Sequence, residues 1–330
     1  MPRFGTASAI PAAYRSWLRK PPLKGGAQPA YDHRESRQLK PAPFTYHLPE
    51  TLAEAVRLLA ELAPQDGRVL AGGQSLVPIM AFRLARPAHL IDINTVAGLD
   101  VLAVRDEVLH IGARARHAAF HRPVQHGPLG AMLAAVVRHI AHYPIRLRGT
   151  FCGSLAHADP AAEWCLVAAT LDAELVACSA RGERRLAARE FFQGAMTTAL
   201  APDELLAETR LPIQPDGTRF GFEEFSRRVG DYALAMALVV LRIESGIIAA
   251  PRIGLGGVEA MPRRIEAAEA ALSGRRPGEA VFREAAAAAA AAIDPIEDVQ
   301  TNEQYRRELA STMVYRALTQ ACMPDWRYRA

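Results

Sequence analysis

The residues best suited to chemistry in this chain are the glycines and polar side chains of Val69–Leu76, which follow an apolar run. Gly72 and Gly73 can adopt a positive φ and let a ligand approach the main chain closely. Ser75 is a good N-cap and Pro78 suits the first turn of a helix, so free N–H groups would face the loop. Such a loop suits phosphate, although an isolated Gly-Gly pair is more often an ordinary strand-to-helix turn.

A second group of small and hydroxyl residues, Thr150–Ser154, lies between an arginine pair and a helix predicted to open at Pro160. Two such loops, each expected at a strand-to-helix junction, could hold one long ligand between them. A dinucleotide fits this arrangement, because the loop N–H groups would bind its pyrophosphate. The Rossmann pattern Gly-x-Gly-x-x-Gly is absent, so a different fold would have to hold it.

Several other polar residues near these loops have two interpretations. Asp159 and Glu163 either complement a helix dipole or accept hydrogen bonds from the hydroxyl groups of a ribose or ribityl chain. His157 has no second ligand at metal spacing, so no metal site is expected. Neither Ser75 nor Ser154 lies in a Gly-x-Ser-x-Gly elbow, which argues against a serine hydrolase.

Tyr232 follows Arg227-Arg228 and precedes an apolar strand. It is either part of a surface turn or a ring that stacks on a flat cofactor.

Composition excludes several classes of protein. The chain has 330 residues, enough for two domains, and its formal net charge is +4. It lacks the basic stripes of a nucleic-acid-binding protein. Its four cysteines form no Cys-x-x-Cys pair, which excludes a recognisable zinc or iron–sulfur site on this chain and favours a reducing cytoplasm. No apolar run reaches the roughly 20 residues of a membrane span.

Residues 1–40 are rich in Pro, Gly, Arg and Lys and are expected to be a disordered extension; alternatively, the protein starts near Leu39. Order is expected from Pro41, with a capping box formed by Thr51 and Glu54. The periodicity predicts these elements up to the turn-rich break at 214–218: a helix over 52–63, a strand over 68–71, a helix over 76–85, strands over 90–93 and 108–112, a helix over 128–142, a hairpin across 181–182 and a strand near 205–212.

After the break, the pattern predicts a smaller domain over 218–325. It contains strands at 220–225, 233–243 and 247–256, the last two joined at Ser245-Gly246, and helices at 262–272, 279–293 and 302–321.

The stretches Ala71–Pro78, Arg83–Pro87 and Leu90–Ile93 resemble the first FAD-binding segment of a known subunit family. Ile145–Ser154, continued through Asp159–Glu163, resembles the second segment. The family comprises the flavin-carrying medium subunits of carbon monoxide dehydrogenase and xanthine dehydrogenase type molybdenum hydroxylases. The resemblance extends over about residues 40–325 in the same order.

This resemblance implies an α+β fold. A PCMH-type (vanillyl-alcohol-oxidase-like) FAD-binding domain over 41–214, with subdomains at about 41–97 and 98–214, would precede an α+β C-terminal domain built from an antiparallel sheet plus helices. The implied cofactor is FAD. The implied cofactor-binding residues are Val69, Leu70, Ala71, Gly72, Gly73, Gln74, Ser75, Leu76, Ile140, Thr150, Cys152, Gly153, Ser154, Asp159, Glu163, Leu206 and Tyr232.

The sequence departs from the family pattern at two places. Cys152 stands where members usually have the first of two glycines; a cysteine supplies the same N–H, but neither a cheap positive φ nor the same open space. Glu223-Glu224 stands where members often have a lysine, and the negative charge would disfavour reduced anionic flavin or weaken anion contacts.

The resemblance also implies an electron-transfer role within a complex. The chain would take electrons from [2Fe–2S] clusters of a small subunit and pass them to an external acceptor, while a large molybdopterin-binding subunit oxidises the substrate. A cytoplasmic dimer of heterotrimers is expected, with no catalytic residue on this chain. Two alternatives stay open: a self-contained FAD oxidoreductase of the same fold, and a non-catalytic assembly module that has lost FAD.

Overall fold

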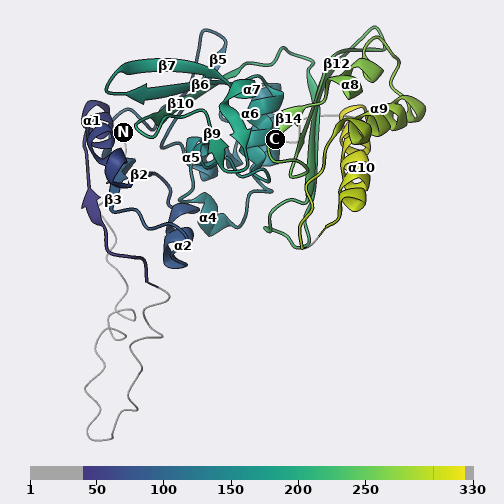
Figure 1. Cartoon of the computed structure of the whole chain (residues 1–330). Coiled ribbons are helices and arrows are strands. Elements are labelled where there is room, and N and C mark those ends of the chain that lie inside the picture. The colour runs from purple at the N-terminus through teal and green to yellow at the C-terminus, as the bar shows by residue number, and fades with distance from the viewer. Residues whose placement is uncertain (1–39, 300, 324–330) are drawn as a thin grey trace, which may run out of the picture. The chain divides into compact units, whose positions relative to one another are not determined.

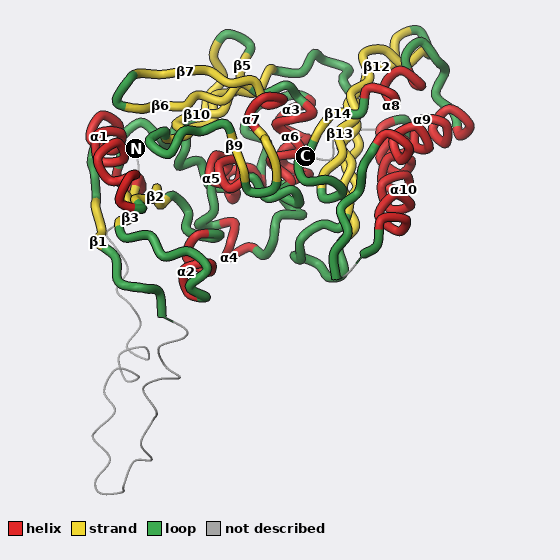
Figure 2. The backbone as a smooth tube through the Cα atoms, in the orientation of Figure 1, coloured by secondary structure: helices red, strands yellow, loops and turns green. Residues whose placement is uncertain are grey.

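The computed structural model describes residues 40–299 and 301–323, which belong to one compact unit (Figure 1). Apart from Lys40, the extension predicted to be disordered lies outside the described residues. Helices and antiparallel strands are mixed along the chain, as the expected α+β fold requires (Figure 2). None of the described helices combines the length and the apolar character that crossing a membrane requires.

The first layer is a three-stranded parallel sheet in the order β1-β3-β2. Helix α1 lies against it through a buried apolar stripe that includes Leu59 and Leu62. The chain leaves β2 directly into the glycine loop, which places this loop at the carboxyl end of a parallel strand. The elements of this layer are β1 (Thr45–His47), α1 (Leu52–Leu62), η4 (Ala63–Gln65), β2 (Gly67–Leu70), α2 (Leu76–Ala81), β3 (His89–Asp92) and η5 (Ile93–Thr95).

The predicted capping box at the start of α1 is half correct. The Thr51 Oγ1 accepts a hydrogen bond from the Glu54 N–H at 3.2 Å, as expected of an N-cap. The Glu54 carboxylate, however, accepts from the N–H of Glu50 at 3.0 Å rather than from that of Thr51. The cap therefore satisfies an amide one residue earlier than the sequence pattern predicts.

The second layer is a five-stranded antiparallel sheet in the order β4-β5-β10-β6-β7. The predicted hairpin is confirmed as β6–β7, and the predicted closing strand as β10. Helix α5 packs on β5 and β10. The elements are β4 (Leu102–Arg105), β5 (Val108–Gly112), η6 (His117–His121), α3 (Pro128–Val136), α4 (Tyr143–Arg146), α5 (Phe151–His157), α6 (Glu163–Thr170), β6 (Glu174–Ser179), β7 (Gly182–Ala187), α7 (Ala188–Phe191), β8 (Phe192–Gly194), β9 (Thr197–Thr198) and β10 (Leu205–Pro212).

The single long helix predicted over 128–142 is wrong. Helix α3 ends at Val136, and Ala141 has a left-handed φ of 41°. The cause is Arg146, whose Nη1 donates to main-chain carbonyl groups that follow α3, among them Ile140 at 2.8 Å and Arg138 at 3.0 Å. The guanidinium supplies hydrogen bonds to carbonyl groups that lose their N–H donors where the helix ends. Helix α2 is also shorter than predicted, and Arg83 with φ 57° follows it.

The C-terminal part is a four-stranded antiparallel sheet in the order β11-β12-β13-β14, with α8 and α10 packed on it and α9 packed against these two helices (Figure 1). The helix predicted from residue 262 starts only at Glu266, because Arg263–Arg264 pair with β13 as a fourth strand. The elements are β11 (Arg219–Phe225), β12 (Ala235–Glu244), β13 (Ile247–Gly256), β14 (Arg263–Arg264), α8 (Glu266–Leu272), α9 (Glu279–Ala292) and α10 (Glu303–Ala321).

Strand β12 is buried on both faces. Met236, Leu238 and Val240 belong to the core that β12 shares with the sheets before it. Val239 and Leu241 belong to the core beneath α8–α10. Because side chains alternate along a strand, one strand closes both cores. This explains why its sequence is a continuous apolar run.

Candidate functional site

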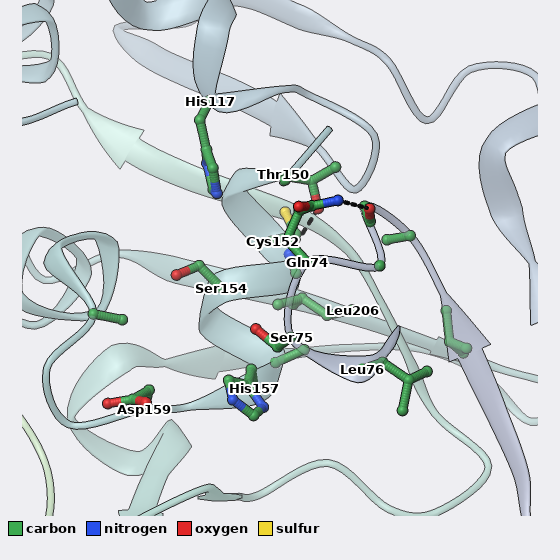
Figure 3. A pocket seen from close by; sticks show the side chains of 18 of the residues that line it. Gln74, Ser75, Leu76, His117, Thr150, Cys152, Ser154, His157, Asp159 and Leu206 are labelled. Carbon is green, nitrogen blue, oxygen red and sulfur yellow. Dashed lines mark hydrogen bonds between the residues drawn. The ribbon is translucent and has the colours of Figure 1, made fainter. Parts of the chain in front are cut away.

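A cavity of about 730 Å³ lies among the loop after β2, helix α5, the α5–α6 loop, the start of β10 and the loop after β11 (Figure 3). Its volume is within the ordinary range of small-molecule sites. The structure brings to its wall every residue predicted for the cofactor site: Val69, Leu70, Ala71, Gly72, Gly73, Gln74, Ser75, Leu76, Ile140, Thr150, Cys152, Gly153, Ser154, Asp159, Glu163, Leu206 and Tyr232.

The two glycines of the first loop have different tasks. Gly73 has a φ of +74°, as expected for a residue that only glycine adopts easily. Gly72 is not in this region; instead, a Cβ there would lie 2.4 Å from the Arg148 carbonyl oxygen and 2.7 Å from the Gly149 Cα. The predicted positive φ is therefore confirmed only at Gly73. Gly72 lets the two loops pack directly against each other.

Ser75 does not cap α2. Its backbone is helical, with φ −101° and ψ −51°, and its side chain makes no capping hydrogen bond. The predicted cap fails because a side chain can reach over a helix start only from an extended residue. In the described part of the chain, the N–H groups of Gln74, Ser75 and Leu76 are paired with no acceptor. The loop therefore presents unpaired donors beside the cavity, as the sequence suggested.

The second loop is a turn of helix rather than an open strand-to-helix loop. Thr150 is the N-cap of α5, and its Oγ1 accepts from the Gly153 N–H at 3.1 Å. Helix α4 precedes it, so the strand predicted before this loop is absent. A Cβ on Gly153 would lie 2.6 Å from the Thr150 Oγ1, so a larger residue at this position would require the Thr150 side chain to shift.

Cys152 turns its side chain away from the cavity. The thiol is buried, its Sγ donates to the Ile111 carbonyl oxygen at 3.4 Å and it lies 3.3 Å from the Thr209 Oγ1. Burial raises the pKa of Cys152 to about 12, so the group stays a neutral thiol. The residue is helical and needs no positive φ. The expected loss of open space at this position is thus not seen, because the side chain occupies the core.

Asp159 and Glu163 face the cavity and not only a helix end. The Asp159 Oδ1 accepts from the Ala161 N–H at 2.9 Å, and the N-cap of α6 is Ala162. Burial raises the pKa of Glu163, Asp159 adds to this rise, and Arg146 opposes it. A solvated acid that only complements a helix dipole would show the opposite shift. Glu163 is therefore a desolvated acid on the cavity wall and not a solvated group at a helix end.

Glu223 and Glu224 lie in β11 and do not line the cavity. The Glu224 side chain is 5% exposed, and its Oε2 lies 3.7 Å from the His139 Nδ1 without a hydrogen-bond partner among the described residues. Burial raises the pKa of Glu224, and the nearby Glu163 raises it further. Glu224 is thus linked to the cavity wall through Glu163, whereas Glu223 faces Arg316.

Apolar and aromatic groups complete the wall. Ile140 and Leu206 supply aliphatic surface, and Leu206 stands beside a bulge in β10 where the register shifts before Glu208. The Tyr232 ring is 67% exposed and also borders a smaller adjoining cavity. An exposed ring on a cavity wall is available for stacking.

The ionisable residues that line the cavity are mostly acidic. Among the described lining residues, Arg68 carries the only guanidinium or ammonium group, and the carboxyl groups are those of Asp159, Glu163, Glu204 and Asp231. An anionic ligand group would therefore be held by neutral N–H and O–H donors. No group of three or more His, Cys, Asp or Glu in the described part of the chain could hold a metal ion, and His157 lines the cavity without such neighbours.

Sequence reasoning missed His117 and its partner Trp164. His117 lines the cavity (Figure 3). Its Nδ1 accepts a hydrogen bond from the Trp164 indole at 2.9 Å. The two residues are 47 positions apart, and no local pattern marks either of them. Only the fold pairs them.

Comparisons with known proteins agree on one family. The model of the FAD binding domain in molybdopterin dehydrogenase matches residues 42–214, and the CO dehydrogenase flavoprotein C-terminal domain matches residues 220–321. The chain is 38% identical over 284 residues to the 6-hydroxypseudooxynicotine dehydrogenase complex subunit alpha of Paenarthrobacter nicotinovorans, covering 86% of this chain and 96% of that one. It is 36% identical over 289 residues to the carbon monoxide dehydrogenase medium chain of Afipia carboxidovorans, covering 85% and 97%.

A solved structure of carbon monoxide dehydrogenase from Hydrogenophaga pseudoflava superposes with a TM-score of 0.82 at 36% identity, covering 85% of this chain and 98% of that one. The predicted fold class is confirmed by this likeness. The glycine loops, their cavity and the full-length similarity lead to one conclusion. The chain belongs to the FAD-binding medium subunits of the carbon monoxide dehydrogenase and xanthine dehydrogenase type molybdenum hydroxylases and is an oxidoreductase flavoprotein subunit with FAD as its cofactor.

Proposed function

We propose that this chain is the electron-transfer subunit of a molybdenum hydroxylase complex. It receives electrons from [2Fe–2S] clusters of a small partner subunit and delivers them to an external acceptor, while a large molybdopterin-binding subunit oxidises the substrate. Bound FAD supplies the redox chemistry. The single observation that carries the proposal is the cavity, whose wall joins both FAD-binding segments of a family match that runs through the C-terminal domain.

The residues present fit FAD. The unpaired N–H groups of Gln74–Leu76 and the main chain of Thr150–Ser154 would hold the pyrophosphate, since they lie on the same cavity and Gly72 packs the two loops together. Asp159 and Glu163 would accept ribose or ribityl hydroxyls. Ile140, Leu206 and Tyr232 would contact the ring systems. We assign this binding role to the whole predicted set, including Val69–Gly73 and Cys152, the latter through its main chain.

The cysteines support a division of labour between subunits. All four are free, Cys152, Cys165 and Cys178 are buried, and no group of three or more possible metal ligands occurs among the described residues. Clusters that need several thiolates therefore belong on a partner chain. Free thiols also favour a reducing cytoplasm as the location. We further propose the domain limits 41–214 and 218–325 and a dimer of heterotrimers, both after the family resemblance.

Purified protein tests the proposal directly. We expect a yellow protein whose flavin absorption bleaches with dithionite and which turns over little without its partners. A colourless chain that cannot be reconstituted with FAD would contradict the cofactor assignment and favour an assembly module. Turnover of a small molecule by the isolated, FAD-loaded chain would instead support a self-contained oxidoreductase.

Co-purification tests the partners. A tagged chain expressed from its native locus should bring down a molybdopterin-binding subunit and a [2Fe–2S] subunit, identified by mass spectrometry. The mass of the complex in solution tests the dimer of heterotrimers.

A further inference from the structure

His117 stands between a buried tryptophan and the cavity. It opens the helical turn η6, and its side chain is 6% exposed. On one side, its Nδ1 lies 2.9 Å from the Nε1 of Trp164, which is fully buried among Phe120 and Phe151. On the other side, it lines the cavity (Figure 3).

This contact determines the tautomer of His117. The indole N–H of Trp164 only donates, so the Nδ1 of His117 must accept and carries no proton. A neutral imidazole then holds its single proton on Nε2. Burial lowers the pKa of His117 to about 3, and the charges of Arg116 and Arg146 act in the same direction. The ring is therefore neutral, with an Nε2–H donor, throughout the neutral pH range.

The Nε2–H faces the place where the two loops meet. A Cβ on Gly149 would lie 2.6 Å from the His117 Nε2, so this edge of the ring packs on Gly149. Gly149 is itself in contact with Gly72 of the first loop. The hydrogen bond that joins the His117 ring to another described residue is made by Nδ1 and does not involve Nε2. A donor this close to both loops is placed for a ligand atom that lies between them.

We propose that His117 is a cofactor-binding residue, whose Nε2–H donates a hydrogen bond to a pyrophosphate oxygen of the dinucleotide, and that Trp164 is the positioning residue that holds this tautomer. The inference rests on the proposed function, in which FAD occupies the cavity. The His117 Nε2–H suits a wall that has one guanidinium and several carboxyl groups, because a neutral imidazole donates a hydrogen bond to a phosphate oxygen without having to take up a proton first.

Two variants at position 117 separate the donor from the rest of the ring. Asn reaches only the place of Nδ1, whereas Gln can put an N–H near the place of Nε2. We expect H117N to lower the affinity of the apo-protein for FAD by about tenfold, the range of a hydrogen bond to a charged group. H117Q should retain most of the affinity, and W164F should lower it less than H117N does. H121Q is the matched control, because His121 ends the same turn but does not line the cavity.

Affinity is measured by flavin fluorescence quenching, with the melting temperature of each apo-variant as a check on folding. Two spectra locate the bond. The ¹⁵N signals of His117 should show a protonated Nε2 and an unprotonated Nδ1, unchanged between about pH 5 and 9. The ³¹P signals of bound FAD should shift in H117Q, even where affinity is retained, and stay unchanged in H121Q.

The outcomes separate this inference from the proposed function. If the wild-type chain does not bind FAD, the proposed function fails and His117 has no such role. If the wild-type chain binds FAD and H117N binds it equally well, the function stands and the role of His117 is refuted. A proton on Nδ1, or protonation of the ring in the tested range, also contradicts the assigned tautomer.

Discussion

Cys152 places its main chain and its side chain in different surroundings. Its main chain lies on the cavity, while its thiol contacts Ile111 and Thr209 in the core. Position 152 is helical and needs no glycine for its backbone conformation, and the thiol adds packing in the core. The backbone N–H that a ligand would use is the same for either residue.

We predict that C152A leaves FAD affinity within about twofold of wild type and lowers the free energy of unfolding by about 1 kcal/mol, because only a buried group is lost. C152G should also keep the affinity but lose about 1 kcal/mol more, the cost of glycine in a helix. FAD titration and urea unfolding of the three proteins check this. A large change in affinity for C152A would place the thiol in the site.

Glu224 makes the stability of the folded protein depend on pH. Its carboxyl group is buried near Glu163, with His139 as a weak partner and Asp159 and Arg146 around Glu163. Its pKa is raised in the folded state, so between the unfolded and folded pKa values the native protein binds more protons than the unfolded chain. Stability then falls as pH rises through this window.

We predict that wild-type protein loses about 1–2 kcal/mol of stability between pH 6 and about pH 8, and that E224Q removes much of this loss. E223Q is the control: Glu223 is adjacent in β11, only half-buried, and Arg316 opposes the rise of its pKa. Urea unfolding of the wild type, E224Q and E223Q at several pH values measures the pH dependence of their stability. Parallel pH profiles of wild type and E224Q would show that Glu224 is charged in the native state.

At the scale of elements, the cavity depends on the contact between a loop that follows a strand of the first sheet and a connection between two helices of the second layer. The loop after β2 and the α4–α5 connection approach so closely that a Cβ on Gly72 would lie 2.4 Å from a backbone oxygen of the other loop. Backbone atoms cannot move aside as a flexible side chain can. The space between the loops is therefore set by the absence of a side chain at one position.

We predict that G72A lowers FAD affinity at least about tenfold, because separating the loops costs about 1–3 kcal/mol. G278A is the matched control, since an added Cβ at Gly278 meets no atom within 4 Å. Equilibrium FAD binding by the two variants, with their melting temperatures, decides the point. Equal affinity of G72A and wild type would mean that the loops separate without cost.

At the scale of the whole molecule, β12 joins two hydrophobic cores. Leu238 packs with the FAD-binding sheets, and the neighbouring Val239 packs beneath α8–α10. Helix α6 covers the face of the C-terminal sheet that helices α8–α10 leave open. It lies so close to β13 that a Cβ on Gly254 would approach the Thr170 Oγ1 to 1.9 Å. We therefore expect the two parts to open as one cooperative unit.

We predict that V239A, which removes about 2 kcal/mol of packing from the C-terminal core, lowers the free energy of amide-hydrogen opening equally in α10 and in α5. Native-state hydrogen exchange in mild denaturant measures both. A loss confined to α10 would show that the C-terminal part opens alone.

Several elements could be predicted because their signals are local. Leu52–Leu62 carries an apolar stripe and an N-cap within a few residues, and β12–β13 are joined at Ser245-Gly246, both with positive φ. The end of helix α3 could not be predicted, because the carbonyl groups that follow it are bound by the guanidinium of Arg146 instead of by the N–H groups of a further helical turn. The short strand β14 was missed because only pairing with β13 defines it.

The sequence by itself determined the two loops, the order of the segments and the family, because glycines, caps and apolar periodicity act on neighbouring residues. Tertiary structure alone decided that Gly72 meets Gly149, that the thiol of Cys152 faces the core, that Glu224 lies near Glu163 and that Trp164 orients His117. Each of these depends on residues far apart in the chain whose distance is set by packing. Burial and contact distance, which decide protonation and donor direction, exist only once the chain has folded.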